Sequence, residues 1–268
     1  MPTIPSRILP LALSATCLLG ESSEYPVNLN LPSTERMQFW DIGILFSHRF
    51  LSAVQGHGKD LYGLDGFAYA GFGVGFGIKP IPGMNVLLYR TADNKTFVAG
   101  LQQQLFDKSL ARAALRIERF DETVPHLKNE IGEVGISGTV VQLPVDVFLG
   151  DYVIVNLVPT YLSRTTTQEK PVFNAGVGLR LLFTDKFNFV GEYYPRPSKI
   201  AKTFKPGWAA GFSYKTFKHR FSLFGTNNPS TTANQVLSGD YGTGPGNYTS
   251  SSKNQGTWSI GFNVARVF

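Results

Sequence analysis

The stretch TWSIGFNVARVF, residues 257–268, ends the sequence and has the alternating pattern of a strand with two different faces. Apolar residues occupy one face and small or polar residues the other: Trp258, Ile260, Phe262 and Val264 against Ser259, Gly261, Asn263 and Ala265. This alternation is typical of an outer-membrane barrel, whose strands meet lipid on one side and water on the other. The last strand of such a barrel pairs with the first, so no backbone group stays unpaired in the membrane.

The composition agrees with this pattern. Charged residues make up 16% and aromatic residues 13% of the 268 residues, with 21 Phe and 28 Gly. Little charge and a mean hydropathy of -0.04 suit strands with one lipid-facing and one water-facing side better than a single buried core. The sequence has no run of 18 apolar residues, so no membrane-spanning helix is predicted. The basic residues behind the net charge of +6 are scattered, and binding to nucleic acid is not predicted.

The N-terminal region has the features of an exported leader. Residues 1–20 contain one basic residue, Arg7, followed by an apolar run, and we interpret them as a signal peptide. The single cysteine, Cys17, lies in that segment, so no internal disulfide is predicted. Residues 21–36 are polar and contain proline, and we expect them to form an N-terminal arm. The barrel is expected over residues 37–268.

Twelve extended segments repeat the alternating pattern. We expect strands at residues 37–50, 63–79, 82–91, 95–106, 109–120, 133–148, 151–164, 171–184, 186–195, 205–217, 218–227 and 256–268. Segment 109–120 contains good helix formers, but its residues divide more cleanly with period two than on a helical wheel, which favours a strand. About 9–11 tilted residues suffice to cross a bilayer, so each segment is long enough.

The connections between these segments alternate in length. Most odd-numbered connections are long, whereas every even-numbered one is tight, as at residues 79–83, 107–108 and 217–218. An all-β, up-and-down antiparallel barrel with short periplasmic turns and longer outer loops has this alternation, and a Greek-key sandwich does not. The longest connection, 229–255, is rich in Ser, Thr, Asn and Gly. It is either a mobile outer loop or a segment folded into the lumen.

Five short motifs occur in order along the chain. They are Ser47-His48-Arg49-Phe50, Gly63-Leu64-Asp65, Glu192-Tyr193-Tyr194-Pro195, His219-Arg220-Phe221-Ser222-Leu223 with Thr226-Asn227, and Gly261-Phe262-Asn263 with Arg266-Val267-Phe268. Together they resemble a bacterial β-barrel family, a domain of unknown function predicted to lie in the outer membrane. The resemblance spans about residues 37–268. It implies a fold and a location but no mechanism.

Charged residues on the water-facing side are the main functional candidates. Strand parity predicts this set facing the lumen: Arg49, Arg90, Arg112, Arg116, Arg180, Lys215, Asp41, Glu118 and Glu192. One interpretation is a set of interior salt bridges that hold the barrel closed. The other is a constriction with a weak preference for anions, because fixed guanidinium groups attract them.

Aromatic residues near strand ends are predicted to form an interfacial girdle. They are Trp40, Trp208, Trp258, Tyr193 and Phe268. The C-terminal strand with its terminal Phe268 is also expected to be recognised by the barrel-assembly machinery. A second pattern, a glycine at every other position from Gly71 to Gly77, predicts a bare lumen wall that a loop or the N-terminal arm approaches closely.

Catalytic and metal sites are not predicted. Ser47 and His48 are neighbours on a strand and face opposite sides, and Ser222 and His219 also differ in parity. A meeting of His48 with His219 across strands stays open. The four histidines and the one cysteine do not have the spacing of a metal site, and no cofactor is predicted.

The sequence thus favours a single barrel in a bacterial outer membrane, acting as a narrow passive channel or a binding barrel for small polar or anionic solutes. Side chains can fill a barrel of about eight strands, whereas about sixteen to eighteen strands leave an open channel. A twelve-stranded barrel is therefore expected to hold a loop or the arm. The alternatives are a lipid-modifying enzyme, an adhesive barrel acting through outer loops such as 228–255, and a soluble barrel with an apolar interior.

Overall fold

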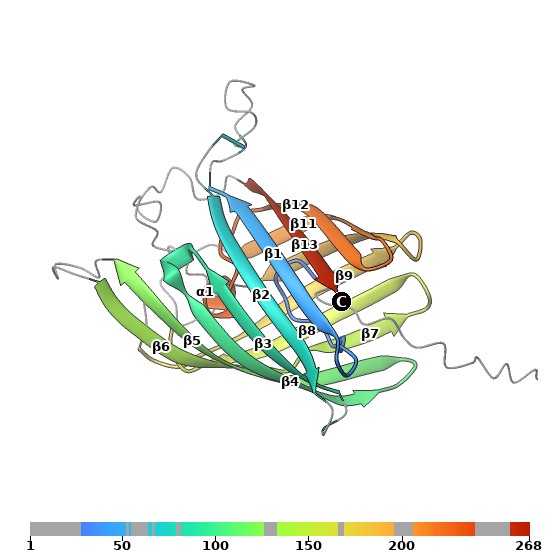
Figure 1. The fold of residues 1–268 in the computed structure, drawn as a ribbon. Helices are drawn as coiled ribbons and strands as arrows, with labels where there is room; N and C mark the ends of the chain where they lie inside the picture. Colours follow the sequence, from blue (N-terminus) through green and yellow to red (C-terminus); the bar gives the residue numbers. More distant parts are fainter. Residues whose placement is uncertain are drawn as a thin grey trace, which may run out of the picture.

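The protein is a closed antiparallel barrel of strands (Figure 1). The computed structural model describes residues 28–51, 54, 64–65, 68–78, 81, 83–125, 133–165, 169–195, 206–238 and 258–268. The strands are β1 (Ile42–Phe50), β2 (Ala68–Ile78), β3 (Met84–Thr91), β4 (Phe97–Asp107), β5 (Ala111–Pro125), β6 (Glu133–Gln142), β7 (Val145–Leu149), β8 (Val153–Leu162), β9 (Val172–Leu182), β10 (Phe187–Tyr194), β11 (Gly207–Lys215), β12 (His219–Thr226) and β13 (Ser259–Val267). A 3-10 turn, η2 (Asp93–Lys95), and a short helix, α1 (Ala233–Ser238), accompany them.

Strands β6 and β7 are two halves of one barrel strand. Both pair with β5 on one side and β8 on the other, without a shift in register between them. Pro144 lies at the break and has no N–H to donate to the ladder. Leu143 beside it still donates its N–H to the Pro159 carbonyl at 3.0 Å. The barrel therefore has the twelve strands that were predicted, and the expected strand 133–148 runs through this break.

The C-terminal strand closes the barrel against the first strand, as predicted. β13 pairs with β12 on one side and with β1 on the other, where Gly43 lies opposite Val267. The N–H of Phe268 extends this pairing to the Ile42 carbonyl at 3.0 Å. Pairing of β4 with β5 completes the ring. The ambiguous segment 109–120 is the strand β5, not a helix.

The connections alternate in length around the ring. Those at one end are short: 79–83, 108–110, 150–152, 183–186 and 216–218. Most of those at the other end are longer: 51–67, 92–96, 126–132, 163–171, 195–206 and 227–258. We call the end with the long connections the outer end and the other the periplasmic end, as in outer-membrane barrels. Among the described residues, no helix is both long and apolar enough to cross a membrane.

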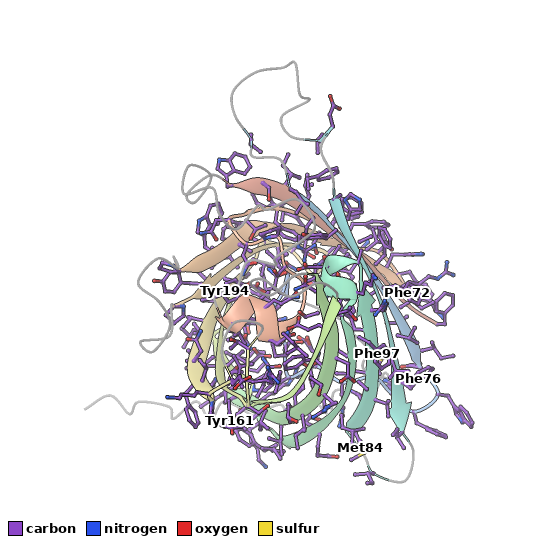
Figure 2. All side chains as sticks on the ribbon, turned by 90° about the vertical axis from the view of Figure 1, so that its left-hand side faces the viewer. Phe72, Phe76, Met84, Phe97, Tyr161 and Tyr194 are labelled. Atoms are coloured by element: carbon purple, nitrogen blue, oxygen red, sulfur yellow. The ribbon has the colours of Figure 1, made fainter. Side chains whose placement is uncertain are left out.

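The two faces of the wall differ as an outer-membrane barrel requires. Large apolar side chains point outward, among them Phe173 with 72% and Leu223 with 63% of the side chain exposed, and Phe72 and Phe76 lie on the outside of the wall (Figure 2). On the inward face, most buried positions of β11, β12 and β13 carry small or polar residues. A soluble barrel with an apolar interior would have the opposite arrangement.

The five aromatic residues predicted as a girdle lie at both rims of the barrel. Trp208, Trp258 and Tyr193 are near the outer end, and Trp40 and Phe268 are near the periplasmic end. All five are exposed. Their contact with the membrane interface stays a prediction.

Candidate functional site

Residues 28–38, which we call the arm, lie inside the barrel beside β1 (Figure 1). The arm enters at the periplasmic end, where Phe39 forms a parallel bridge with Gly77. A Cβ atom at Gly77 would lie 2.1 Å from the Gln38 carbonyl oxygen, so only glycine permits this approach. Gly71 and Gly73 instead leave room for the Tyr89 side chain. The predicted glycine wall therefore receives the arm at one position and an aromatic ring at two.

Glu192, on the inward face of β10, binds the backbone of the arm. Its carboxylate accepts hydrogen bonds from the N–H groups of Leu29 at 2.7 Å, Asn30 at 3.0 Å and Leu31 at 3.3 Å. The Tyr194 hydroxyl donates to the same carboxylate. Successive N–H groups that converge in this way form an anion-binding nest. Here the anion is a side chain of the barrel wall.

Arg49, on β1, binds the same part of the arm from another strand of the wall. Its guanidinium is buried and donates to the Asn30 side-chain oxygen at 2.8 Å and to the Asn263 side-chain oxygen at 2.9 Å. The amide of Asn263 in turn donates to the Leu29 carbonyl at 2.8 Å. The guanidinium also lies over the Phe224 ring, 4.5 Å from its centroid. Three strands that are distant in sequence thus hold one turn of the arm.

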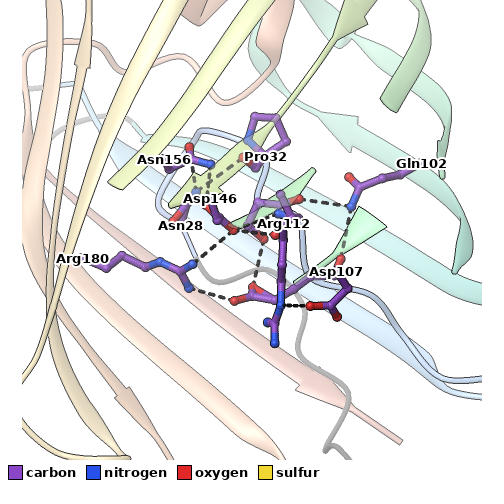
Figure 3. A network of polar contacts seen from close by, with 11 residues as sticks. Asn28, Pro32, Gln102, Asp107, Arg112, Asp146, Asn156 and Arg180 are labelled. Atoms are coloured by element: carbon purple, nitrogen blue, oxygen red, sulfur yellow. Dashed lines mark hydrogen bonds and ion pairs between the residues drawn. The ribbon is translucent and has the colours of Figure 1, made fainter. Parts of the chain in front are cut away.

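A second anchor lies nearer the periplasmic end (Figure 3). Arg180 of β9 donates to Glu35 of the arm at 2.9 Å and to Asp146 of β7 at 3.3 Å. Asp146 also accepts the Thr34 hydroxyl at 2.6 Å and the Asn156 amide at 2.8 Å. Burial alone would raise the pKa of the Glu35 carboxyl, but the charge and hydrogen bond of Arg180 hold that pKa below its usual value.

Neutral wall side chains bind the remaining backbone of the arm. Gln102 of β4 donates to the carbonyls of Ser33 and Glu35, both at 3.1 Å. Asn85 of β3 accepts the N–H of Met37 at 3.3 Å. The arm therefore obtains most of its hydrogen bonds from wall side chains, not from strand pairing.

Residues 227–238, which we call the outer segment, fill the lumen from the other end. Helix α1 of this segment lies within the ring of strands (Figure 2). Gln235 and Asn234 donate to the carboxylate of Glu122 at 3.2 and 3.4 Å. Ser230 donates to Asp93 at 3.2 Å. This part of the predicted loop 229–255 is thus folded into the lumen, and residues 239–255 lie outside the described residues.

An apolar cluster covers part of the inner wall beneath the outer segment. Val236 and Leu237 of α1 and Leu31 of the arm belong to it. The wall contributes the buried side chains Val98, Phe120, Ile136, Val140, Val158, Leu162, Val172 and Tyr194. Apolar residues occur at both parities in β6 and β8, and this feature of the sequence could have indicated the cluster. The lumen is therefore not uniformly polar, and the two inserted segments share one apolar contact region.

A cavity of about 100 Å³ remains between the arm, the outer segment and the wall of β1 to β6. Its lining includes Arg49, Tyr89, Gln102, Arg116, Glu118 and Gln142. The Arg49 Nε and Gln142 Oε1 atoms are buried without a hydrogen-bond partner. Leu45, Leu87 and Val98 also line it, so the lining is mixed. A space of this size with polar groups in its wall accommodates a few water molecules or one small solute.

The predicted lumen residues divide into three groups. Arg49, Arg180 and Glu192 contact the arm, as described above. Arg116 and Glu118 form an ion pair with each other beside the cavity, with 2.7 Å between Arg116 Nε and the carboxylate.

The third group lies at the periplasmic rim. Arg112 pairs with Asp107 at 2.7 Å and lies over the Phe148 ring. Asp41 accepts the N–H of Gln38 at 3.1 Å, and Lys215 ends β11, half-buried.

Arg90 was predicted to face the lumen, and this was wrong. Its inward neighbours on β3 are Asn85, Leu87 and Thr91, whereas Arg90 itself is exposed and donates to the Lys95 carbonyl. Because the inward face of β3 includes apolar residues, polarity does not identify its faces. Near the outer rim a long cationic side chain reaches polar surroundings from the outward face.

Several contact residues were not among the predicted site residues. Asp146, Asn156, Gln102 and Asn263 bind the arm, and Glu122 binds the outer segment. Their inward parity was readable from the alternating pattern. Their partners could not be read from the sequence, because residues that meet inside the barrel are far apart along the chain. Leu29 of the arm and Glu192, for example, are separated by 163 positions.

The described histidines do not meet. His48 lies opposite Phe262 and stacks on its ring at 5.0 Å, whereas His219 lies opposite Arg266. Four residues along β13 separate these positions by about 13 Å. His57 and His126 lie outside the described residues. Within the part of the chain that the structure describes, no group of three or more His, Cys, Asp or Glu side chains is placed to hold a metal ion.

Comparison with known proteins agrees with the fold. Residues 142–268 match the model of a family described as a membrane bound beta barrel domain (DUF5777). The resemblance to a membrane β-barrel family is confirmed. The family model covers the C-terminal half of the barrel, so the motifs at residues 47–50 and 63–65 lie outside it. A comparison with curated protein sequences finds no match.

Solved structures of outer-membrane proteins are similar to this barrel. The COG4313 outer membrane channel from Pseudomonas putida F1 has a TM-score of 0.50 and 9% identity, over 90% of this chain and 100% of that chain. The outer membrane protein Omp33 of Acinetobacter baumannii has a TM-score of 0.42 and 11% identity, over 85% of this chain and 98% of that chain. At these identities the likeness to the channel from Pseudomonas putida F1 concerns the fold alone.

Proposed function

We propose that the protein is a bacterial outer-membrane channel of low conductance for small polar solutes. The observation that carries this proposal is the cavity of about 100 Å³ beside the two inserted segments. The charged and amide side chains in its lining can bind water and small hydrophilic molecules, and its size excludes larger ones. The outward apolar face, which suits outer-membrane lipids as surroundings, supports the location.

The charges inside the barrel favour little discrimination between anions and cations. Among the described residues, the buried carboxylates are Asp93, Glu118, Glu122, Asp146 and Glu192, and the buried guanidinium groups are Arg49, Arg180 and Arg220. The set of lumen-facing residues on which the anion preference was predicted did not include three of these carboxylates, Asp93, Glu122 and Asp146. We therefore propose neutral or zwitterionic polar solutes, with an anion-selective constriction as the alternative.

Partners and activity follow from the same proposal. We propose that outer-membrane lipids surround the barrel and that the assembly machinery recognises the strand ending at Phe268. We also propose that the protein is not an enzyme, because the described histidines lie on the outward face, apart from each other.

Planar-bilayer recording of the refolded full-length protein tests the channel. We expect small current steps and, across a KCl gradient, a reversal potential near zero because the buried charges of both signs are mixed. A strongly anion-selective potential would favour the alternative constriction. Absence of current steps in every salt would overturn the channel, and retention of a solute without current would favour a binding barrel.

A further inference from the structure

We infer that the inner wall of the barrel is a peptide-binding site and that the arm is its tethered, displaceable ligand. The ligand class is a peptide with a turn that directs three successive N–H groups to one side, an apolar side chain at the third of these residues and a carboxylate four residues later. In this chain those features are residues 29–31, Leu31 and Glu35. Binding of such a peptide does not require that the barrel conduct.

The first observation is that the wall contacts mainly the backbone of the arm. The wall side chains that bind arm N–H or C=O groups are Glu192, Arg49, Asn263, Gln102, Asn85 and Asp146. They come from β10, β1, β13, β4, β3 and β7, so they surround the arm. Side chains that converge on a peptide backbone from many strands form a peptide site, because every peptide carries N–H and C=O groups.

The second observation is that the strands pair without the arm. Each strand of the ring has a hydrogen-bonded neighbour on both sides, and β13 with β1 closes it. The residues that follow the arm make the bridge between Phe39 and Gly77 and accept a hydrogen bond from the Gly77 N–H at the Asp41 carbonyl, both at the rim. Departure of residues 28–38 therefore leaves the ladder of the barrel complete.

The third observation is that the site selects side chains at two positions. Leu31 packs against the wall at Gly176, where a Cβ atom would lie 2.4 Å from its methyl carbon. Glu35 meets the buried guanidinium of Arg180, which also pairs with Asp146. An apolar pocket and a buried cation give the site sequence preference in addition to backbone binding.

A labelled synthetic peptide of residues 28–38 tests the inference on the full-length barrel. The Glu35→Gln barrel keeps its arm but weakens the tethered contact, so the added peptide, which carries Glu35, competes with it. We expect saturable binding to Glu35→Gln, at least about tenfold tighter than to the unaltered barrel, because a hydrogen bond to a charged group is lost from the competing arm. Fluorescence anisotropy measures this difference.

Two matched controls define the site. A peptide of the same composition in scrambled order should not bind. In the Glu35→Gln barrel, Glu192→Gln should weaken peptide binding about tenfold or more, whereas Asp107→Asn at the rim should leave it unchanged. Equal binding of the scrambled peptide, or no effect of Glu192→Gln, overturns the inference.

Hydrogen exchange of the unaltered full-length protein gives a second readout that does not depend on the Glu35→Gln substitution. Excess peptide should accelerate exchange of the Leu29, Asn30 and Leu31 amides as the arm leaves the site. Unchanged exchange of these amides, together with no peptide binding to Glu35→Gln, overturns the proposal. If the peptide binds but no variant conducts, the peptide site stands and the proposed channel fails.

Discussion

The two segments inside the barrel are held by different forces. The arm lies in a set of charged and amide side chains, and its main anchors are Glu192 and Arg180. The outer segment inserts Val236 and Leu237 into an apolar cluster of the wall and adds hydrogen bonds to Glu122. The first contact is electrostatic and directional, whereas the second depends mainly on apolar burial.

This difference predicts which segment is released more easily. Added salt and acid weaken contacts between charges in a wet lumen, whereas neither removes the free energy gained by burying apolar area. The arm should therefore respond to solution conditions and to competing ligands. The outer segment should stay in place under the same conditions.

The largest effect is expected from removing the arm. Without residues 1–36 the lumen loses most of the arm, which extends from the periplasmic end to Glu192 and Arg49 near the outer ends of β10 and β1, so the single-channel conductance should rise several-fold. The strand ladder stays complete, and the barrel should keep its far-ultraviolet circular dichroism. Planar-bilayer recording measures the change, and an unaltered conductance would show that the outer segment alone sets the narrowest point.

Leu237→Ala should loosen the outer segment and leave the arm bound. Truncation of a buried leucine costs about 2–5 kcal/mol, and Leu237 lies in the apolar cluster with 1% exposure. Hydrogen exchange over residues 233–238 should accelerate more than tenfold. Leu223→Ala, on the outward face, is the matched control. Equal acceleration in the arm would contradict the separation of the two anchors.

Glu192→Gln should loosen the arm and leave the outer segment in place. It removes the charge that accepts three arm N–H groups, and a hydrogen bond to a charged group contributes about 1.5–3 kcal/mol. Exchange of the Leu29, Asn30 and Leu31 amides should accelerate, while residues 233–238 keep their rates. Asp107→Asn serves as the control. If the arm amides still exchange slowly in Glu192→Gln, packing holds the arm in place and the Glu192 carboxylate does not.

The smallest effect is expected from acid. Because the folded-state pKa of Glu35 is lowered, its contribution to arm binding is present above the pKa of a free glutamate, about 4.3, and is lost as the pH falls through the lowered value. The groups that face this carboxyl are Arg180, Arg220 and Ser33. The protection factors of the arm amides, which are the intrinsic exchange rates divided by the observed rates at the same pH, should therefore fall a few-fold in strong acid. Glu35→Gln should have a smaller pH response, and an identical one would assign the effect to other carboxylates.

Much of the fold could be predicted from single strands. Segment 257–268 displays the two faces because adjacent residues on any strand point to opposite sides. The same rule failed for Arg90, since the inward face of β3 is partly apolar and a rim arginine reaches polar surroundings from either face. It also left the apolar cluster of the inner wall unrecognised, because Phe120 and Val158 look lipid-facing in isolation.

The sequence by itself determined the twelve strands, their closure and the direction of most side chains, because these depend on residues that are neighbours in the chain. Only the tertiary structure decided what fills the lumen. The N–H groups of residues 29–31 find the Glu192 carboxylate, and Glu35 finds Arg180, because ring closure brings β1, β9, β10 and β13 around one axis. No local pattern encodes which buried charges face each other across that space.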